Sequence, residues 1–190
     1  MKALKVVHNS FIPQYFLVKM DSRLHFVFQS STKIYFVSDF VDGGTLSYYI
    51  QNDLLCLADI VLIAAELVIA LDAIHQCNFV FRDLKPDNIL INEEGHVRLV
   101  DFGLCSSANA RWTGGATPEY LPPEGINRSS FDETGDWWQL GIVVWEMVTK
   151  STPFNDRTPA AIYSNIQNKR LEKPSNMSIG ISFEKGNHSP

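Results

Sequence analysis

The stretch Phe81-Arg82-Asp83-Leu84-Lys85-Pro86-Asp87-Asn88, together with the later Asp101-Phe102-Gly103, decides how this chain is interpreted. An acid, a lysine and an amide follow one another within the first motif, and the second motif adds another acid. The residues between them are short apolar runs on either side of a Glu94-Gly95 turn. A hairpin of this kind returns the chain to its start. We therefore expect Asn88 and Asp101 to lie close together.

These side chains fit the transfer of a phosphoryl group from a magnesium nucleotide. That reaction needs a base for the attacking hydroxyl, oxygens for the cation and a positive charge on the moving phosphate. Asp83 is the candidate base, and Lys85 can neutralise the phosphate. Asn88 and Asp101 offer a neutral and a charged oxygen to Mg²⁺. The alternative is a surface turn rich in Asp, Lys and Pro, which the second motif at this spacing disfavours.

Both motifs resemble those of the eukaryotic protein kinases. Thr117-Pro118-Glu119-Tyr120-Leu121-Pro122-Pro123-Glu124 is similar to the kinase segment that ends in Ala-Pro-Glu, with Pro122 in place of the alanine. Asp136-Trp137-Trp138-Gln139-Leu140-Gly141 resembles the start of the large central helix of the C-terminal lobe. The Trp pair and Phe102-Gly103-Leu104-Cys105 resemble the AGC group of serine/threonine kinases. The similarity runs from about Leu24 to Asn168.

The resemblance implies an α+β, protein-kinase-like fold, made mainly of the helical C-terminal lobe with a remnant of the N-lobe β-sheet and the hinge. It divides the chain into an N-lobe remnant with the hinge strand at 1–41, a C-lobe at 42–172 and a disordered tail at 173–190. The C-lobe holds the catalytic loop 81–88, the Asp-Phe-Gly motif 101–103 and the activation segment 101–124. The implied activity is transfer of the ATP γ-phosphate to Ser or Thr hydroxyls of a protein substrate, with ATP and Mg²⁺ as cofactors.

The first residues depart from the kinase pattern. No G-x-G-x-x-G occurs, nothing upstream of Leu24 is interpreted as the Val-Ala-x-Lys strand, and no acidic residue precedes Asp21. Residues 1–23 resemble at most the tail of the N-lobe helix and its exit. We therefore expect a kinase domain truncated at both ends, without the glycine-rich loop, the strand lysine and the last C-lobe helices.

The resemblance also assigns the nucleotide site. Asp39 and Val41 would offer backbone groups to the adenine edge from the hinge strand. Ser38 would guard the rear pocket, and Leu90 would form the floor under the adenine. Gly43-Gly44 follows at the spacing of the family. The alternative for each of these positions is ordinary strand core.

Regulatory and substrate-facing roles follow from the same comparison. Thr113 lies four residues before Thr117, where AGC kinases carry an activating phosphothreonine, and a phosphate there would pair with Arg82. An ordinary loop threonine is the alternative, because Trp112-Thr113-Gly114-Gly115-Ala116 departs from the family pattern. Thr117 faces the substrate in this interpretation, and Asp87 helps to bind basic substrate residues. Thr45 replaces a carboxylate that supports arginine recognition in the family.

Periodicity and turn residues predict the individual elements. Apolar residues at three- and four-residue spacing predict a long helix from Leu57 to Cys77, and Thr45 is a candidate N-cap for a short helix to Asn52. Residues 104–123 show no period and are interpreted as a long loop. The other predicted strands and helices are Leu24–Gln29, Lys33–Val41, Phe79–Val80, Ile89–Ile91, Val97–Val100, Trp137–Val148 and Pro159–Asn168.

Composition limits the remaining possibilities. The chain has 190 residues and a net charge of −5, which argues against a nucleic-acid partner. Three scattered cysteines indicate an intracellular, cytoplasmic protein. The apolar runs Ile60–Leu71 and Trp137–Val148 are shorter than the ~20 residues that span a bilayer, so we expect no membrane segment.

Two alternatives to an active kinase stay open. The apolar faces of the helices at 57–77 and 137–148 would lose part of their cover without further C-lobe helices, so a partner that covers them is expected. The chain could therefore be a catalytically inactive kinase-like binding module. A truncated product without a role of its own is the second alternative.

Overall fold

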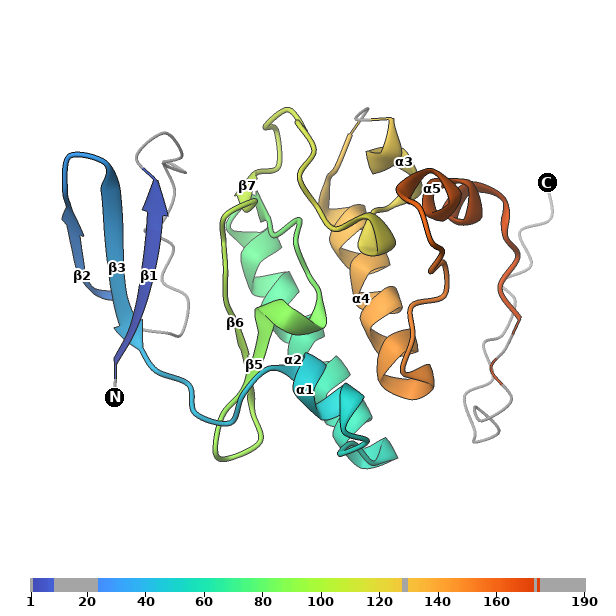
Figure 1. The fold of residues 1–190 in the computed structure, drawn as a ribbon, viewed down its shortest axis with the longest axis horizontal. Coiled ribbons are helices and arrows are strands. Elements are labelled where there is room, and N and C mark those ends of the chain that lie inside the picture. The colour runs from blue at the N-terminus through green and yellow to red at the C-terminus, as the bar shows by residue number, and fades with distance from the viewer. Residues whose placement is uncertain (1, 9–23, 128–129, 173, 175–190) are drawn as a thin grey trace.

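The computed structural model describes residues 2–8, 24–127, 130–172 and 174 (Figure 1). A small antiparallel sheet lies at one end of the molecule, and two long helices with a β-hairpin beside them form the larger part (Figure 1). This is the expected α+β architecture. Except for Pro174, the predicted disordered tail at 173–190 lies outside the described residues.

The N-terminal sheet has three strands in the order β1-β3-β2, with antiparallel pairing throughout: β1 Lys2–His8, β2 Leu24–Gln29 and β3 Lys33–Asp39. The turn between β2 and β3 closes with the N–H of Ser30 donating to the carbonyl of Lys33 at 2.8 Å. Ile34 and Phe36 on the central strand are buried. The predicted hairpin is confirmed, although β3 ends two residues earlier than the predicted strand.

Strand β1 corrects a prediction. The expected tail of an N-lobe helix would have included Lys2–His8, but these residues pair along their whole length with β3, from Lys2 opposite Asp39 to His8 opposite Lys33. Valines at positions 6 and 7 suit a strand. The pairing itself depends on a partner about thirty residues away in the chain, which local sequence does not reveal. The remainder of that expectation falls on 9–23, outside the described residues.

Helix α2, Leu57–Gln76, starts as predicted, ends one residue before the predicted Cys77 and buries one stripe of its surface. Its N-terminus is capped by the side chain of Asp59, which accepts the backbone N–H of Cys56 at 2.8 Å. The short helix α1, Leu46–Gln51, begins after the predicted N-cap Thr45, whose hydroxyl accepts the N–H of Tyr48. The buried stripe of α2 consists of Ile63, Leu67, Leu71, Ile74 and His75.

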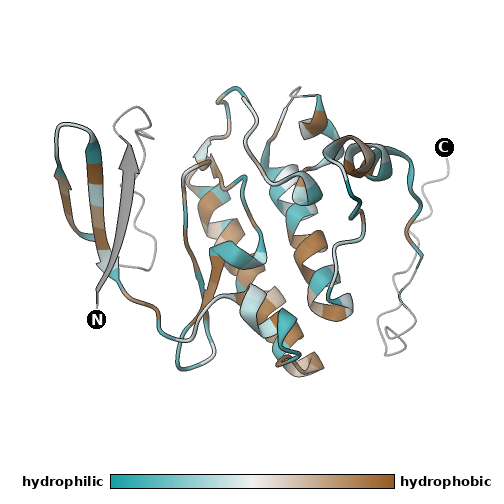
Figure 2. Cartoon of the chain, in the orientation of Figure 1, coloured by the Kyte–Doolittle hydropathy of each residue, from teal (hydrophilic) through white to brown (hydrophobic). Residues whose placement is uncertain are grey.

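Helix α4, Glu133–Thr149, packs beside α2 and completes the main core. It begins at Glu133, four residues before the predicted start, after its N-cap Asp132. Glu133 and Thr134 need no apolar period to form a first turn after such a cap. Apolar segments on both helices are visible in Figure 2. Shorter helices follow the activation segment and end the described core: α3 Pro123–Ile126 and α5 Pro159–Asn168, the latter as predicted.

Short strands and single 3-10 turns fill the space in front of α2. Strands β5, Ile89–Ile91, and β6, Val97–Leu99, form the predicted hairpin. Strand β4, Phe79–Val80, pairs with β7, Ser106–Ser107, which lies inside the segment predicted to be a loop. The two 3-10 turns are η1, Pro86–Asn88, and η2, Pro118–Tyr120.

A carboxylate on α2 holds this hairpin in place. Glu66 Oε2 accepts the backbone N–H of Val97 at 2.8 Å, and its Oε1 lies 2.6 Å from His96 Nδ1. Burial acts to raise the pKa of Glu66, but the Val97 and His96 hydrogen bonds and the Arg98 charge together hold it below its ordinary value. A carboxyl with a lowered pKa stabilises the fold above the unfolded-state pKa and loses this contribution as the pH falls through the folded-state pKa.

We therefore expect Glu66→Gln to destabilise the chain at about pH 6, and this difference to shrink as the pH falls below about 4.3. Thermal unfolding of both proteins between about pH 3 and about pH 6 measures it. The matched control is Glu94→Gln, because Glu94 is an exposed residue of the hairpin turn. A Glu66→Gln melting temperature that tracks the wild type at every pH would contradict the assignment.

The outer face of α2 carries apolar side chains in solvent, among them Val61, Leu62, Val68 and Ile69, the last with 69% of its surface exposed. This agrees with the expectation that a helix at 57–77 is incompletely covered. Within the described residues, no helix is both long enough and apolar enough to cross a membrane.

Candidate active site

A single buried carboxylate on α4 anchors the backbone of the catalytic loop. Asp136 is fully buried, and its Oδ2 accepts the N–H of Phe81 at 2.8 Å and lies 2.8 Å from His75 Nε2. Its Oδ1 accepts the N–H of Arg82 at 2.7 Å. An ionised carboxylate offers enough lone pairs for all three groups. Asp136 therefore sets the position of the backbone immediately before Asp83.

Gln139, one turn further along α4, binds the backbone of the residues before and after Asp83. Its Oε1 accepts the N–H of Leu84 at 2.9 Å, and its Nε2 donates to the carbonyl of Arg82 at 3.3 Å. Gln139 is almost completely buried. Two side chains of one helix thus fix the backbone on both sides of Asp83. Both lie inside the motif at 136–141, but the sequence analysis assigned neither of them a role.

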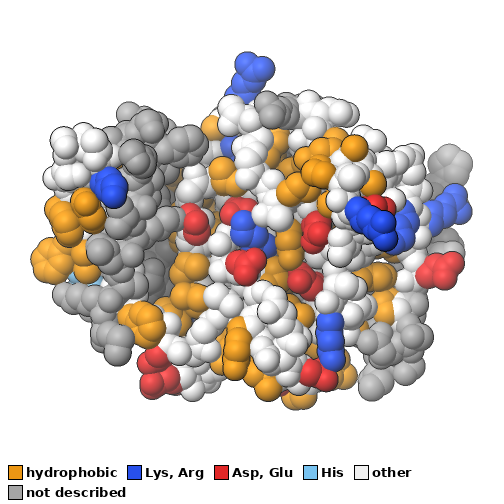
Figure 3. Space-filling view, viewed as in Figure 1, with side chains coloured by type: hydrophobic (Ala, Val, Ile, Leu, Met, Phe, Trp, Pro, Cys, Tyr) orange, Lys and Arg blue, Asp and Glu red, His pale blue; other side chains and the backbone are white. Residues whose placement is uncertain are grey.

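Three of the predicted catalytic side chains meet directly. Lys85 Nζ lies 3.2 Å from Asp83 Oδ1 and 3.1 Å from Oδ2. Asn88 Nδ2 donates to the carbonyl of Asp83 at 2.8 Å and to its Oδ2 at 2.7 Å. Lys85 Nζ also donates to Thr117 Oγ1 at 3.0 Å. Charged side chains of both signs gather in the middle of this face of the molecule (Figure 3).

Asp101 reaches the same place through the hairpin. The N–H of Val100 donates to the carbonyl of Asn88 at 2.9 Å, which ties the start of the second motif to the end of the first. Asp101 has a positive φ of 61°, and its Oδ1 accepts the N–H of Gly103 at 3.2 Å. The ring of Phe102 packs edge-on against the buried Phe81, with centroids 5.0 Å apart. The two motifs are therefore joined by backbone and by core contacts.

The charges of the site act on one another. Burial raises the pKa of the Asp83 carboxyl, the Lys85 and Asn88 hydrogen bonds oppose this, and the nearby negative charge of Asp101 raises the pKa further. The negative charge of Asp101 therefore acts on the Asp83 carboxyl.

Residues predicted for the nucleotide lie around the link between the sheet and the helical part. The carbonyl of Gly44 accepts the N–H of Ile91 at 2.9 Å, and Thr45 forms a β-bridge with Leu90. A Cβ on Gly43 would stand 2.2 Å from the carbonyl oxygen of Ile91, so only glycine permits this approach. Leu90 is thereby held against the end of the hinge segment.

Asp39 lies at the end of β3, and His25 Nε2 approaches its Oδ1 at 2.5 Å across the sheet. Val41 follows in the extended link, where it is partly buried. Ser38 is also partly buried, and its hydroxyl donates to the carbonyl of Asp39 at 3.3 Å. The contacts with Leu90 and its neighbour Ile91 come from Thr45 and Gly44, which follow this segment.

Comparisons with known proteins agree with this geometry. The family model described as "Protein kinase domain" matches residues 19–187. The curated protein "Serine/threonine-protein kinase Sgk1" from Homo sapiens is 44% identical over 161 residues, which cover 81% of this chain and 37% of that protein. Sgk1 from Gallus gallus is 44% identical over 160 residues, which cover 81% of this chain and 37% of the relative. Sgk1 from Danio rerio is 43% identical over 162 residues, which cover 82% of this chain and 37% of the relative.

The chain belongs to the protein kinase family. The predicted resemblance to AGC-like serine/threonine kinases and the protein-kinase-like fold are confirmed. The chain spans little more than a third of the length of these relatives, 37% of human Sgk1. Protein kinases as a family use ATP and Mg²⁺ and act on protein substrates.

Membership of the kinase family draws attention to a kinase-like motif on β1 that the sequence analysis missed. Ala3-Leu4-Lys5 has the Ala-x-Lys spacing of the kinase strand whose lysine pairs with the nucleotide phosphates. It lies on a strand paired with the hinge strand β3, with Lys5 opposite Phe36. The sequence analysis did not consider this match upstream of Leu24. The signal was present at Ala3 and Lys5, but without a glycine-rich pair of strands before it the motif was not noticed.

A second missed feature is an acidic cluster beside the catalytic loop. Tyr120 donates its hydroxyl to Glu146 Oε2 at 2.5 Å, and Glu119 Oε2 accepts the hydroxyl of Thr152 at 3.0 Å. Burial raises the pKa of Glu146, the Tyr120 hydrogen bond opposes this, and the charges of Glu119 and Asp87 raise it further. Asp87, Glu119 and Glu146 therefore concentrate negative charge where the substrate-facing Asp87 was predicted.

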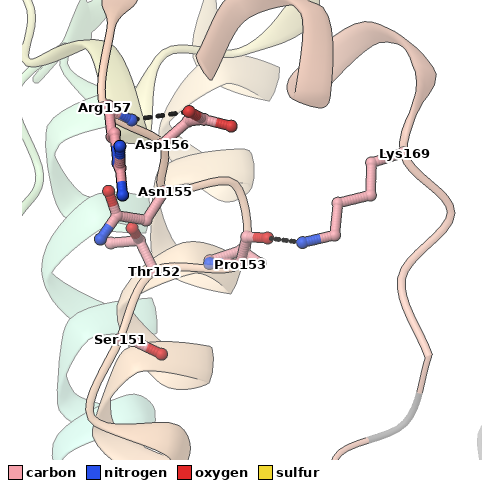
Figure 4. A pocket seen from close by; sticks show the side chains of 7 residues that line it. All are labelled: Ser151, Thr152, Pro153, Asn155, Asp156, Arg157 and Lys169. Carbon is pink, nitrogen blue, oxygen red and sulfur yellow. Dashed lines mark hydrogen bonds between the residues drawn. The ribbon is translucent and has the colours of Figure 1, made fainter. Parts of the chain in front are cut away.

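The hollow drawn in Figure 4 is not part of the candidate active site. The loop 151–157 after α4 and Lys169 after α5 line it, and Lys169 Nζ donates to the carbonyl of Pro153 at 2.8 Å. None of the predicted site residues lines it. The hydrogen bond from Thr152 to Glu119 links its lining to the acidic residues described above.

Proposed function

We propose that this chain carries the catalytic centre of a serine/threonine protein kinase, which transfers the γ-phosphate of ATP to Ser or Thr hydroxyls of proteins. The observation that carries the proposal is the arrangement around Asp83. Its carboxylate is held by Lys85 and Asn88, and the negative charge of Asp101 acts on it from nearby. This set of groups matches the needs of phosphoryl transfer.

The geometry supports a distinct role for each side chain. Asp83 is largely buried and lies near the negative charge of Asp101, and its carboxylate can orient a substrate hydroxyl and accept its proton. Lys85 bridges Asp83 and Thr117, which places one positive charge between the catalytic loop and the end of the activation segment. In this position its ammonium can neutralise charge on the transferring phosphate.

Asn88 and Asp101 fit a magnesium ion. Both N–H groups of the Asn88 amide point to Asp83, which orients its remaining oxygen away from that residue. Within the described residues, no group of three or more His, Cys, Asp or Glu side chains could hold a metal by itself. A site with one amide and one carboxylate fits an ion that takes its other ligands from phosphates and water, as Mg²⁺ does. Bound there, the ion would neutralise charge on the nucleotide phosphates.

For the nucleotide itself, we propose that the backbone of Asp39 and Val41 binds the adenine edge, Ser38 limits the rear of the pocket and Leu90 lies under the ring. The close approach of Gly43-Gly44 to β5 supports this arrangement. Lys5 is the candidate partner of the phosphates, since it occupies the Ala-x-Lys position on β1.

The acidic cluster indicates the class of substrate. The negative charges of Glu119 and Asp87 lie close enough to Glu146 to raise the pKa of its carboxyl. A basic peptide would relieve this repulsion. We therefore propose a preference for Ser or Thr sites that are accompanied by Arg or Lys residues.

The test is transfer of labelled phosphate from MgATP to a Ser peptide that contains arginines, followed by mass spectrometry of the product. We expect transfer to the Ser peptide, none to the same peptide with Ala in place of Ser, and loss of transfer on chelation of Mg²⁺. Asp101→Asn should lower the rate by about a hundredfold or more, because the site loses its charged ligand. Transfer unaffected by both chelation and Asp101→Asn would contradict the proposed metal site.

A binding module without catalysis is the second candidate, and the apolar outer face of α2 favours it. We propose that a protein partner covers this face. Nucleotide binding distinguishes the two candidates. A melting temperature that does not respond to MgATP, in a chain that is stably folded, would support the binding module.

The three cysteines are free thiols, two exposed and one buried, which is compatible with a reducing compartment. We propose that the protein acts inside the cell, in the cytoplasm.

A further inference from the structure

Each of the three guanidinium nitrogens of Arg82 donates one hydrogen bond to the activation segment or its surroundings. Its Nε donates to the carbonyl of Phe131 at 3.0 Å, its Nη1 donates to Ser106 Oγ, and its Nη2 donates to the carbonyl of Ala110 at 2.9 Å. Only 3% of the residue is exposed. Arg82 is the catalytic-loop residue that precedes Asp83, so these bonds join the activation segment to the catalytic loop.

The ring of Trp112 packs against the guanidinium of Arg82. The guanidinium carbon of Arg82 lies 5.7 Å from the centroid of its ring, at the distance of a cation–π contact. Trp112 is 4% exposed, its ring lies 4.9 Å from that of Phe131, and its Nε1 donates to the carbonyl of Gly125 at 3.2 Å. With Val80 and Leu121 it forms a buried cluster separate from the main core.

Thr113, the next residue, is exposed. In kinases whose activation segment is ordered by phosphorylation, the added phosphate binds arginine and holds the segment in place. Here the same arginine already has acceptors on each of its three nitrogens and an aromatic ring over its plane. All of these groups belong to the unmodified chain.

We propose that Trp112 is a positioning residue that orders the activation segment on Arg82 without a phosphate on Thr113. The inference rests on the proposed kinase function and adds its regulation: the unmodified segment is in the working arrangement. The far end of the segment supports this, since Thr117 already receives the hydrogen bond from Lys85 in the catalytic loop. The Thr113 phosphate predicted from the sequence is then dispensable.

The first experiment compares the full chain before and after phosphatase treatment, together with Thr113→Ala. Mass spectrometry establishes the phosphate content of each sample. We expect the rate of transfer to the arginine-containing peptide to agree within about twofold among the three. A rate that falls on phosphatase treatment and in Thr113→Ala, and returns when Thr113 is phosphorylated, would overturn the inference while leaving the proposed function intact.

The second experiment replaces Trp112. Trp112→Ala should raise the KM for the peptide about tenfold or more while the KM for ATP stays within about twofold, because the hinge contacts are untouched. Trp112→Phe keeps an aromatic face over Arg82 and should recover most of the loss. Equal losses in both constants, or no recovery in Trp112→Phe, would indicate a general structural role and reject the inference.

A measurement without activity separates this inference from the function itself. Hydrogen–deuterium exchange should speed up over residues 104–117 in Trp112→Ala and stay slow in Thr113→Ala. If the wild type transfers no phosphate but the exchange pattern holds, the proposed function fails and the ordering role of Trp112 stands. Fast exchange over 104–117 in the unphosphorylated wild type would reject the ordering role directly.

Discussion

Asp83→Asn is expected to lower kcat for phosphate transfer by about 10²–10⁴-fold with MgATP binding retained. The amide has nearly the shape of the carboxylate but cannot accept the proton of the substrate hydroxyl. It also places an NH₂ group against one of the two donors that now bind the carboxylate, Lys85 Nζ and Asn88 Nδ2. The effect should therefore fall on the chemical step, because the proposed adenine contacts come from the hinge.

Steady-state transfer to the arginine-containing peptide measures kcat, and a nucleotide titration measures binding. The matched control is Asp72→Asn, since Asp72 lies on the exposed side of α2, where its carboxylate accepts only Gln76 Nε2 at 2.6 Å among the contacts of the described residues. It should transfer phosphate at the wild-type rate. Equal rates for Asp83→Asn and the wild type would reject Asp83 as the catalytic base of this chain.

Asp136→Asn is expected to lower the free energy of unfolding by about 3 kcal/mol or more. The fully buried carboxylate accepts the backbone N–H groups of Phe81 and Arg82 and contacts the ring of His75. An amide has one oxygen and one NH₂ group, so at least one donor loses its acceptor and faces another donor. An unsatisfied buried donor costs about 1–3 kcal/mol, and the opposed pair adds to this.

Chemical denaturation measures the change, and a fall in melting temperature of about 6–12 °C should accompany it. Asp72→Asn again serves as the control, with an expected change within about 0.5 kcal/mol because its site is exposed. An Asp136→Asn chain as stable as the wild type would show that the catalytic loop has another anchor.

Elements whose signal is local were predictable from the sequence. Helix α2 agreed with its prediction within a residue because a complete apolar stripe lies along it, and α1 agreed because Thr45 is a strong N-cap. Strand β7 could not be predicted, since Ser106 and Ser107 have no strand pattern and pair only because β4 lies beside them. Strand β1 was missed for a related reason, as its partner β3 is distant in the chain.

The candidate site likewise contains residues that the sequence revealed and residues that it did not. Asp83, Lys85, Asn88 and Asp101 were chosen from two short motifs. The structure brings the first three into contact, and a backbone hydrogen bond from Val100 to Asn88 ties the segment before Asp101 to them. Asp136, Gln139 and Glu146 were not assigned roles because their importance depends on what faces them across the core. No spacing along the chain reveals that a helix residue accepts hydrogen bonds from a loop more than fifty positions earlier.

By itself, the sequence determined the family, the catalytic side chains and the helices that support them, because these depend on residue identity and on short spacings. Only the tertiary structure decided that α4 carries the catalytic loop on Asp136, that acidic residues from three segments converge, and that Trp112 covers Arg82. Hydrogen bonds and charge effects act through space, so they become visible only when distant segments are packed together.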